Sequence, residues 1–464
     1  MAVLKFNPGY NTFDSDSYAI HMENPSEPNL FRDIFPYDEI PRIGFNHRLV
    51  PMKMPRDIWI TDTTFRDGQQ SMPPYTVKQC VDIYKLLRRL GGDLGLIRQA
   101  EFFLYTKKDQ EAVSQILSLG YRYPEVTGWV RAQKKDLALA RNMGLKETGI
   151  LTSASDYHIY LKLRKNRQQA MDDYLGVVRD AIDVGITPRC HLEDATRADF
   201  YGFVVPLAHE LLKVADESKS VVKIRICDTL GLGVPYPGVA MPRSVAGLVY
   251  GLQYHAGVPS EWLEWHGHND LCLVTANAVT AWLYGCSAAN GTILGLGERT
   301  GNPPLEALVV NYLQLRGNDG NIDTTVITEI AEYFRNELKV PIPETQPLVG
   351  SGFNTTRAGV HADGLLKNEE IYNVFNTEKL LNRPVVLALT DKSGVAGIVL
   401  WVKSRIGEGR RTPLTKDHPG VRRIYEWLMA EYDQGRATGI LDREMFEQVK
   451  ANLGDWLKEN GYEI

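Results

Sequence analysis

The feature that most constrains the fold is a regular alternation along the middle of the chain. Short β-branched or apolar runs alternate with amphipathic stretches of helical length, which is the pattern of β-α-β units in an α/β protein. Helical periodicity is clearest over residues 77–90, 167–184 and 206–216. The expected strands are residues 57–61, 97–103, 125–131, 147–152, 187–192, 221–227, 262–265 and 288–294. Eight strands over about 240 residues fit a closed (β/α)8 TIM barrel better than an open doubly wound sheet.

The segments on either side of this alternation differ from it. Residues 1–55 are rich in Pro, Asn, Asp and aromatic residues without a sustained period, so we expect an irregular N-terminal arm. The catalytic barrel is predicted over residues 56–318. Residues 319–405 hold a helical stretch, a Pro/Gly-rich connector and a mixed segment, which we expect to form a linker and subdomain. Residues 406–464 are predicted to be a C-terminal helical region.

Composition disfavours several classes of protein. The 464 residues include 52 Lys+Arg and 57 Asp+Glu, so the chain lacks the basic excess that nucleic-acid binding usually needs. The five cysteines form no C-x-x-C pair, which favours a reducing compartment over a disulfide framework. No apolar run has the length of a membrane span, and the first residues lack a signal-peptide pattern. We therefore expect a cytoplasmic protein with neither nucleic acid nor membrane as a partner.

Polar clusters follow five of the predicted strands. They are DTTFRDGQQ at 62–70, EDATR at 193–197, DTLG at 228–231, HGHND at 266–270 and GLGERTGN at 295–302. In (β/α)8 barrels the catalytic groups lie at the C-terminal ends of the strands. Because these ends converge on one mouth, the sequence predicts a single catalytic site there.

His266 and His268 are the sharpest local signal. Side chains two apart in a strand point to the same face, so both imidazoles can bind one metal ion, and Gly267 leaves room between them. The alternative is a hydrogen-bonded histidine pair with no ligand. A strand-end carboxylate such as Asp67 favours the metal, because two imidazoles with oxygen donors suit a divalent ion that has open positions. Arg66 forms either a plain ion pair or a group that stabilises negative charge on a reacting oxygen.

Taken together, these motifs resemble the DRE-TIM metallolyase superfamily. Within it they look like the acyl-transferring synthases, which are the isopropylmalate, homocitrate, citramalate and Re-citrate synthases. The signature D-T-T-x-R-D-G-x-Q and the segments E-D-x-x-R, D-T-x-G, H-x-H-N-D and G-x-G-E-R-x-G-N occur in the family's order. Five matches in order are far more specific than any one of them.

The resemblance implies a metal centre in the barrel. Its residues would be Asp67, His266 and His268 as ligands, with Asn302 close by. Manganese is favoured as the divalent ion, and magnesium, cobalt and zinc also fit. Arg66 would face the reacting keto oxygen, and Glu298 would support the site from strand 8.

The resemblance also implies groups for substrate and catalysis. Gln70 and Thr229 would contact the bound oxoacid, and Glu101 belongs to a loop that helps shape its pocket. The family places a catalytic His and Tyr eleven residues apart after the barrel, a spacing that His361 and Tyr372 reproduce. In relatives this subdomain reaches into the partner subunit's barrel, so a homodimer with active sites completed in trans is implied.

Departures from the family pattern bear on the substrate. The usual D-G-E-Q reads D-G-Q-Q here, and only Glu101 is kept from the I-E-V-G-F-P segment after strand 2. Substrate therefore cannot be copied from isopropylmalate synthase. The long arm, Phe65 and the Gln69-Gln70 pair are most similar to Re-citrate synthases.

The expected reaction is a metal-dependent Claisen condensation of acetyl-CoA with oxaloacetate, giving citrate and CoA. The distal carboxylate of oxaloacetate needs a fixed cation or several N–H donors. Arg197 is the first candidate and Arg131 the second, whereas the alternative for Arg197 is a salt bridge to Glu193 or Asp194. Homocitrate, citramalate or isopropylmalate synthase chemistry on another 2-oxoacid stays open. So does a non-catalytic barrel that binds a metal or metabolite.

Overall fold

The computed structural model describes residues 5–7, 12–14, 20–318, 321–356, 359–406 and 413–462. The chain divides into two compact units, Met1–Ile322 and Asp323–Ile464. Within the described residues, no helix combines the length and the apolar character needed to cross a bilayer.

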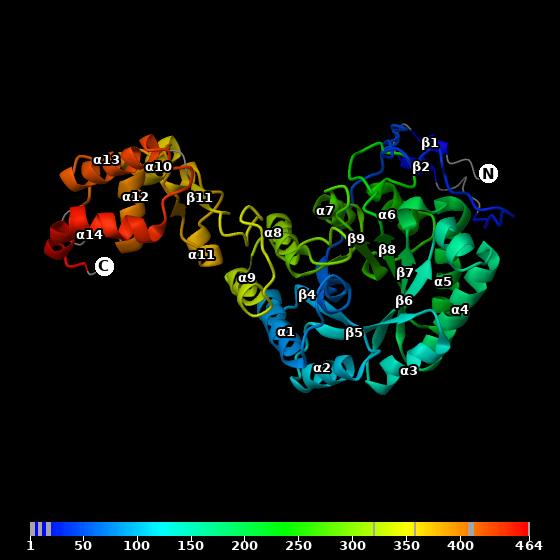
Figure 1. The fold of residues 1–464 in the computed structure, drawn as a ribbon. Helices are drawn as coiled ribbons and strands as arrows, with labels where there is room; N and C mark the ends of the chain where they lie inside the picture. The colour runs from blue at the N-terminus through cyan, green and yellow to red at the C-terminus, as the bar shows by residue number, and fades with distance from the viewer. Residues whose placement is uncertain are drawn as a thin grey trace. The chain divides into compact units, whose positions relative to one another are not determined.

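The first unit contains a closed barrel of eight parallel strands in the order β10-β3-β4-β5-β6-β7-β8-β9 (Figure 1). The strands are β3 (Trp59–Asp62), β4 (Ile97–Phe102), β5 (Glu125–Arg131), β6 (Glu147–Ser153), β7 (Thr187–Glu193), β8 (Lys223–Asp228), β9 (Leu263–Gly267) and β10 (Ala288–Gly291). This confirms the predicted barrel. The largest difference is at β10, which ends before the predicted residue 294 because the chain turns into the 3-10 helix η7 (Ile293–Gly295), where Leu294 has a φ of 57°.

Helices follow the strands and surround the barrel (Figure 1). They are α1 (Val77–Gly91), α2 (Lys107–Ser118), α3 (Lys134–Asn142), α4 (Arg167–Asp183), α5 (Val205–Ser218), α6 (Val245–Tyr254), α7 (Val274–Tyr284) and α8 (Leu305–Arg316). Helix α1 shows why they form. Its capping box pairs Thr76 with Gln79, and Ile83, Leu87 and Leu90 are buried at helical spacing.

Residues 20–55 of the N-terminal arm lie on their own barrel. The arm's first described elements, β1 (Lys5–Asn7) and β2 (Thr12–Asp14), pair antiparallel. Further along, Tyr157 Oη donates to the Leu30 carbonyl at 2.8 Å. Arg243, which is 2% exposed, donates to the carbonyls of Pro41 and Arg42 at 3.1 and 2.9 Å. Tyr157 and Arg243 follow β6 and β8, so the arm runs along the end of the barrel where the strands terminate.

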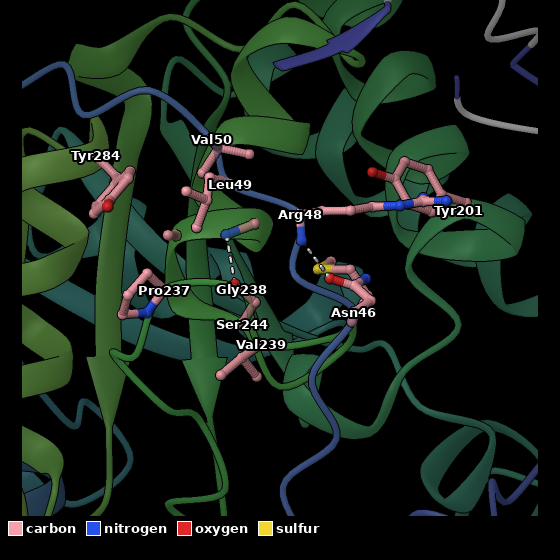
Figure 2. A pocket seen from close by; sticks show the side chains of 13 residues that line it. Asn46, Arg48, Leu49, Val50, Tyr201, Pro237, Gly238, Val239, Ser244 and Tyr284 are labelled. Atoms are coloured by element: carbon pink, nitrogen blue, oxygen red, sulfur yellow. Dashed lines mark hydrogen bonds between the residues drawn. The ribbon is translucent and has the colours of Figure 1, made fainter. Parts of the chain in front are cut away.

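A hollow between the arm and the barrel is shown in Figure 2. Arm residues 46–50 lie there beside the segment after β8, and Tyr201 and Tyr284 complete the wall. The Asn46 N–H donates to the Gly238 carbonyl at 3.0 Å. Its lining contains none of the predicted site residues, so we assign it to the docking of the arm.

Charged side chains cross the barrel interior. Glu101 of β4 and Arg225 of β8 lie on opposite sides of the barrel, and their side chains meet at 3.0 Å. Arg189 of β7 joins Glu101 at 3.0 Å, and Arg225 also pairs with Glu264 of β9 at 2.8 Å. All four residues are at most 3% exposed. Barrel interiors are usually filled by branched apolar residues. We call these four charged residues the ionic layer, and they depart from that pattern.

The second unit is mostly helical. Its helices are α9 (Val326–Asn336), α10 (Gly359–Lys367), α11 (Thr377–Leu381), α12 (Val395–Ile406), α13 (Pro419–Asp433) and α14 (Asp442–Glu459), with a 3-10 turn η8 (Glu369–Ile371). Strands β11 (Thr355–Thr356) and β12 (Val386–Leu387) pair in parallel. One apolar core includes Leu387 and Ile398 together with Val421 and Leu453. Segments on both sides of residue 405 therefore share that core.

Candidate active site

A π-helical turn carries the first group of site residues. The turn η2 (Thr64–Gly68) follows β3 directly, and all of its residues are buried. Thr64 anchors it, because its hydroxyl donates to Asp62 at 2.5 Å and accepts from the Ile293 N–H at 2.9 Å. The turn is thereby tied to the chain after β10, which aims Arg66 and Asp67 at the strand ends.

Three predicted metal ligands come together at these ends. Donor atoms of Asp67, His266 and His268 all lie within 4.8 Å of one another. The two imidazoles are 5.2 Å apart and nearly perpendicular, and His268 Nε2 is 3.7 Å from Asp67 Oδ2. Each of the three residues is at most 5% exposed. His266 in β9 and His268, one residue past its end at Gly267, therefore do point to one side, as the sequence predicted.

The donor set fits a divalent cation. Among the described residues, His268 Nδ1 and Asn302 Oδ1 are buried polar atoms with no hydrogen-bond partner. Asn302 Nδ2 donates to Asp67 Oδ2, which places the amide next to the three ligands. A Cβ at Gly297 would lie 2.0 Å from that same amide nitrogen, so a glycine is needed there. Two imidazoles, a carboxylate and an amide oxygen together match the ligand chemistry of a divalent ion.

Electrostatics keep this set ready to bind a cation. Burial favours a raised pKa for Asp67, but the opposing contributions, of which the charge of Arg66 is the largest, hold the pKa below its ordinary value. Burial lowers the pKa of His266 to about 3, and it also lowers the pKa of His268. At neutral pH the site therefore presents a carboxylate and two neutral imidazoles, the protonation states that bind metals.

Arg66 is fixed by two carboxylates. Its Nε donates to Glu101 Oε1 at 2.8 Å, and its Nη1 donates to Asp67 Oδ1 at 3.1 Å. Glu101 also meets Arg189 and Arg225, and these charges hold its pKa well below the ordinary value despite burial. The structure does not place Glu101 on the wall of the cleft, so its direct contact is with Arg66 rather than with the surroundings of a substrate.

A cleft of about 820 Å³, counted to its open rim, lies beside Asp67, His266 and His268, and its volume is within the range of small-molecule sites. It is lined by Arg66, Asp67, Gln70, Trp129, Leu151, His191, Glu193, Cys227, Thr229, His266, His268, Glu298 and Arg299. The predicted Gln70, Thr229 and Glu298 therefore lie beside the possible metal site.

Six predicted residues are not among those that line the cleft: Glu101 and Asn302, which contact Arg66 and Asp67, and four others. Arg131 pairs with Asp136 at 2.8 Å, and it does not line the cleft. Arg197 pairs with Asp194 at 2.8 Å, which is the alternative that the sequence left open for it. His361 and Tyr372 belong to the second unit, where their rings are 4.2 Å apart and their side chains are exposed.

The sequence prediction missed several wall residues. Glu193 ends β7 and accepts from Lys162 at 3.0 Å, and His191 stands two residues earlier on the same side of the strand. Trp129 stands two residues before Arg131 in β5. Arg299 is the second cationic residue of the wall and pairs with Asp270 at 2.8 Å. Alternation counted back from each strand end could have found His191 and Trp129.

A buried carboxyl supports the loop after β10. Glu306 of α8 accepts from the Leu294 N–H at 3.1 Å, and burial raises its pKa to about 7. Between about pH 4.5 and 7 the folded state holds a proton that the unfolded state has lost, so the free energy of unfolding falls as pH rises through this window. Glu306→Gln has no such proton to lose. We therefore expect its free energy of unfolding, relative to that of the parent, to rise by about 2 kcal/mol from pH 5 to pH 8.

Urea denaturation at the two pH values measures this difference. Glu111→Gln, on the exposed side of α2, makes the same change of side chain and is the matched control. A pH-independent difference between Glu306→Gln and the parent would contradict a raised pKa at this position.

A closed parallel barrel with a possible metal site at its strand ends defines a class of protein, and comparison with known families identifies it. The HMGL-like family matches residues 57–334, and the chain belongs to this family. This confirms the resemblance to the DRE-TIM metallolyases. In structure, the chain is similar to an HMG-CoA lyase from Acinetobacter baumannii in complex with coenzyme A and 3-methylmalate. The TM-score is 0.50 at 17% identity, over 62% of this chain and 92% of the other.

Curated relatives narrow the class further. The chain is 54% identical to a citrate (Re)-synthase from Syntrophus aciditrophicus, over 97% of this chain and 72% of that protein. It is 53% identical to a citrate (Re)-synthase from Clostridium kluyveri, over 92% of this chain and 95% of that protein. A 2-phosphinomethylmalate synthase from Streptomyces hygroscopicus is 37% identical, over 90% of this chain and 95% of that protein.

Proposed function

We propose that the protein is a Re-citrate synthase, an acyltransferase that condenses acetyl-CoA with oxaloacetate to citryl-CoA, whose thioester water then hydrolyses to give citrate and CoA. The observation that carries the proposal is the buried group of Asp67, His266 and His268 at the floor of a cleft whose wall includes Arg66. The choice of substrate is supported by two citrate (Re)-synthases, which are identical to this chain at more than half of the aligned positions over nearly its whole length.

A bound divalent ion, with manganese favoured, would polarise the keto group of the oxoacid and fix its orientation. Arg66 stands beside the ligand Asp67 and directs guanidinium N–H groups toward the floor of the cleft. It would stabilise the negative charge that develops on the keto oxygen, and Glu101 keeps it in place. Gln70 and Thr229 would bind the oxoacid from the wall.

The second acid group of the substrate needs its own partners. Citrate is malate carrying a carboxymethyl arm, and the product named for the Streptomyces relative carries a phosphinomethyl arm instead. Both arms are acidic, so a pocket for them requires N–H donors or a cation. Arg299 and His191 line the cleft, so they are better placed for this role than Arg131 or Arg197.

The base that deprotonates the acetyl methyl group is assigned to His361 with Tyr372. Their rings are 4.2 Å apart and exposed, so the pair is accessible to another surface. A Cβ at Gly364 would come within 2.6 Å of the Tyr372 ring, so this glycine permits the pairing. We propose that the pair serves the barrel of a partner subunit in a homodimer.

Release of CoA thiol tests the proposal. Purified protein with manganese and acetyl-CoA is supplied separately with oxaloacetate, 2-oxoglutarate, pyruvate and 2-oxoisovalerate. We expect oxaloacetate to have a kcat/KM at least about 10³-fold above pyruvate and 2-oxoisovalerate, because these leave donors built for a second acid group unpaired. 2-Oxoglutarate keeps a second acid group one methylene further out, so we expect a smaller preference of about 10- to 200-fold against it.

Turnover of 2-oxoisovalerate alone would overturn the citrate proposal and favour isopropylmalate synthesis. Metal binding at full occupancy with no turnover of any oxoacid would favour a non-catalytic barrel. The stereochemical face is read from citrate made with isotopically labelled acetyl-CoA.

A further inference from the structure

We propose that Asn290 is a positioning residue that sets the tautomer of the ligand His266, and that the charged interior of the barrel dictates this setting through Thr61. The inference rests on the metal site of the proposed function and assigns a purpose to the ionic layer beneath it.

The contacts form one continuous chain across three neighbouring strands. Asn290 of β10 is directly opposite Thr61 of β3 in register. Ala288 pairs with Glu264 of β9, so two residues further along each strand Asn290 and His266 stand at the same level. His266 Nδ1 lies 2.8 Å from Asn290 Oδ1.

The other half of the amide faces β3. Asn290 Nδ2 donates to Thr61 Oγ1 at 2.9 Å and to the Thr61 carbonyl at 3.2 Å. The Thr61 hydroxyl in turn donates to Glu264 Oε1. None of the four residues is more than 5% exposed, so water does not compete for these hydrogen bonds.

The donor and acceptor in each of these hydrogen bonds follow from the ion pair of Glu264 at one end of the chain of contacts. Arg225 binds both oxygens of Glu264, at 2.8 and 3.0 Å, and Arg189 lies 3.4 Å away, so two buried guanidinium groups pair with Glu264 as a carboxylate. A carboxylate only accepts hydrogen bonds, so the Thr61 hydroxyl must donate its single hydrogen to Glu264. Thr61 Oγ1 is then left to accept from Asn290.

The amide of Asn290 consequently has one possible orientation. Its NH2 group faces two acceptor atoms of Thr61, so its oxygen must face His266. An amide oxygen only accepts, so His266 Nδ1 must carry the proton and Nε2 must keep its lone pair. Nε2 is then in the form that binds a cation before any cation arrives, which is the usual task of a partner behind a metal-binding histidine.

His268 provides an internal contrast. Its Nδ1 is buried and has no hydrogen-bond partner among the described residues. Its Nε2 lies 3.7 Å from Asp67 Oδ2, beyond hydrogen-bond distance, so no hydrogen bond among the described residues fixes its tautomer. The two histidines of the site therefore differ: one is set in advance and the other is not.

Two substitutions at Thr61 separate this role from simple packing. Thr61→Val keeps the volume and loses the hydroxyl, whereas Thr61→Ser keeps the hydroxyl and loses a methyl group. Calorimetric titration of metal-free protein with Mn²⁺ should show weaker binding for Thr61→Val and parent-like binding for Thr61→Ser. Asn290→Ala should weaken Mn²⁺ binding by about 10- to 100-fold.

Asn277→Ala is the matched control, since Asn277 is also buried and donates to the Gly233 carbonyl without touching a ligand. It should bind Mn²⁺ like the parent even if it unfolds at a lower temperature. Two-bond ¹H–¹⁵N spectra of histidine-labelled, metal-free protein give a second readout. The Nδ1–H tautomer of His266 should dominate in the parent and in Thr61→Ser, and lose its dominance in Asn290→Ala.

Equal Mn²⁺ affinity for Thr61→Val and Thr61→Ser, or parent-like affinity and tautomer in Asn290→Ala, would overturn the inference. These measurements use no substrate, so they can be distinguished from a failure of the proposed reaction. A parent that binds Mn²⁺ but ignores oxaloacetate would contradict the reaction alone.

Discussion

Asp67→Asn is expected to remove the metal and the activity together. The substitution keeps the shape of the side chain but deletes the negative charge that completes the group formed with His266 and His268. Metal polarisation of a carbonyl contributes several kcal/mol, so we expect turnover to fall by about 10³-fold or more. Metal content by mass spectrometry and thiol release from acetyl-CoA, measured on the same preparation, check both halves of the expectation.

The control is Asp136→Asn. Asp136 is 4% exposed and pairs with Arg131 as Asp67 pairs with Arg66, but it lies outside the cleft. Its substitution should leave the metal content unchanged. His268→Ala should reproduce the loss seen in Asp67→Asn. Activity that survives either ligand substitution after thorough chelation would refute the metal assignment.

The barrel could be predicted because each strand and helix carries its own local pattern. The apolar period along α1 and the short run at β4 are visible within one element. The ionic layer could not be predicted, because its partners meet only after the barrel closes. Glu101 and Arg225 are 124 residues apart in the chain, and nothing near either residue indicates the other.

The same distinction applies to the site. The convergence of Asp67, His266 and His268 was predictable, because strand ends converge in any such barrel and an H-x-H pair shares one side of its strand. Arg131 and Arg197 were harder, because each has a carboxylate partner within five residues and pairs with it. Its position at a strand end shows that an arginine lies near the mouth of the barrel. Whether that arginine pairs with a neighbouring carboxylate or faces the cleft depends on the three-dimensional structure.

The second large effect is expected at the exposed pair of the helical unit. His361→Ala should lower kcat by about 10²- to 10⁴-fold, the usual contribution of a positioned base, while metal content stays at the parent level. Tyr372→Phe keeps the ring beside His361 and removes only the hydroxyl, so it isolates the contribution of that proton donor. Because both side chains are exposed, stability should change by less than about 0.5 kcal/mol. Loss of metal in His361→Ala would contradict the proposal that the barrel binds the metal and the helical unit supplies the base.

Mixing two inactive variants tests whether the pair acts on a partner subunit. In a symmetric dimer, the heterodimer of Asp67→Asn and His361→Ala would have one site with an intact barrel and an intact His361 from the other subunit. Random association makes half of the dimers heterodimers, and one of the two sites in each heterodimer is intact. Co-expression should therefore restore about a quarter of the parent activity. If His361 instead served its own barrel, every site would lack one group, and the mixture would stay as inactive as its components.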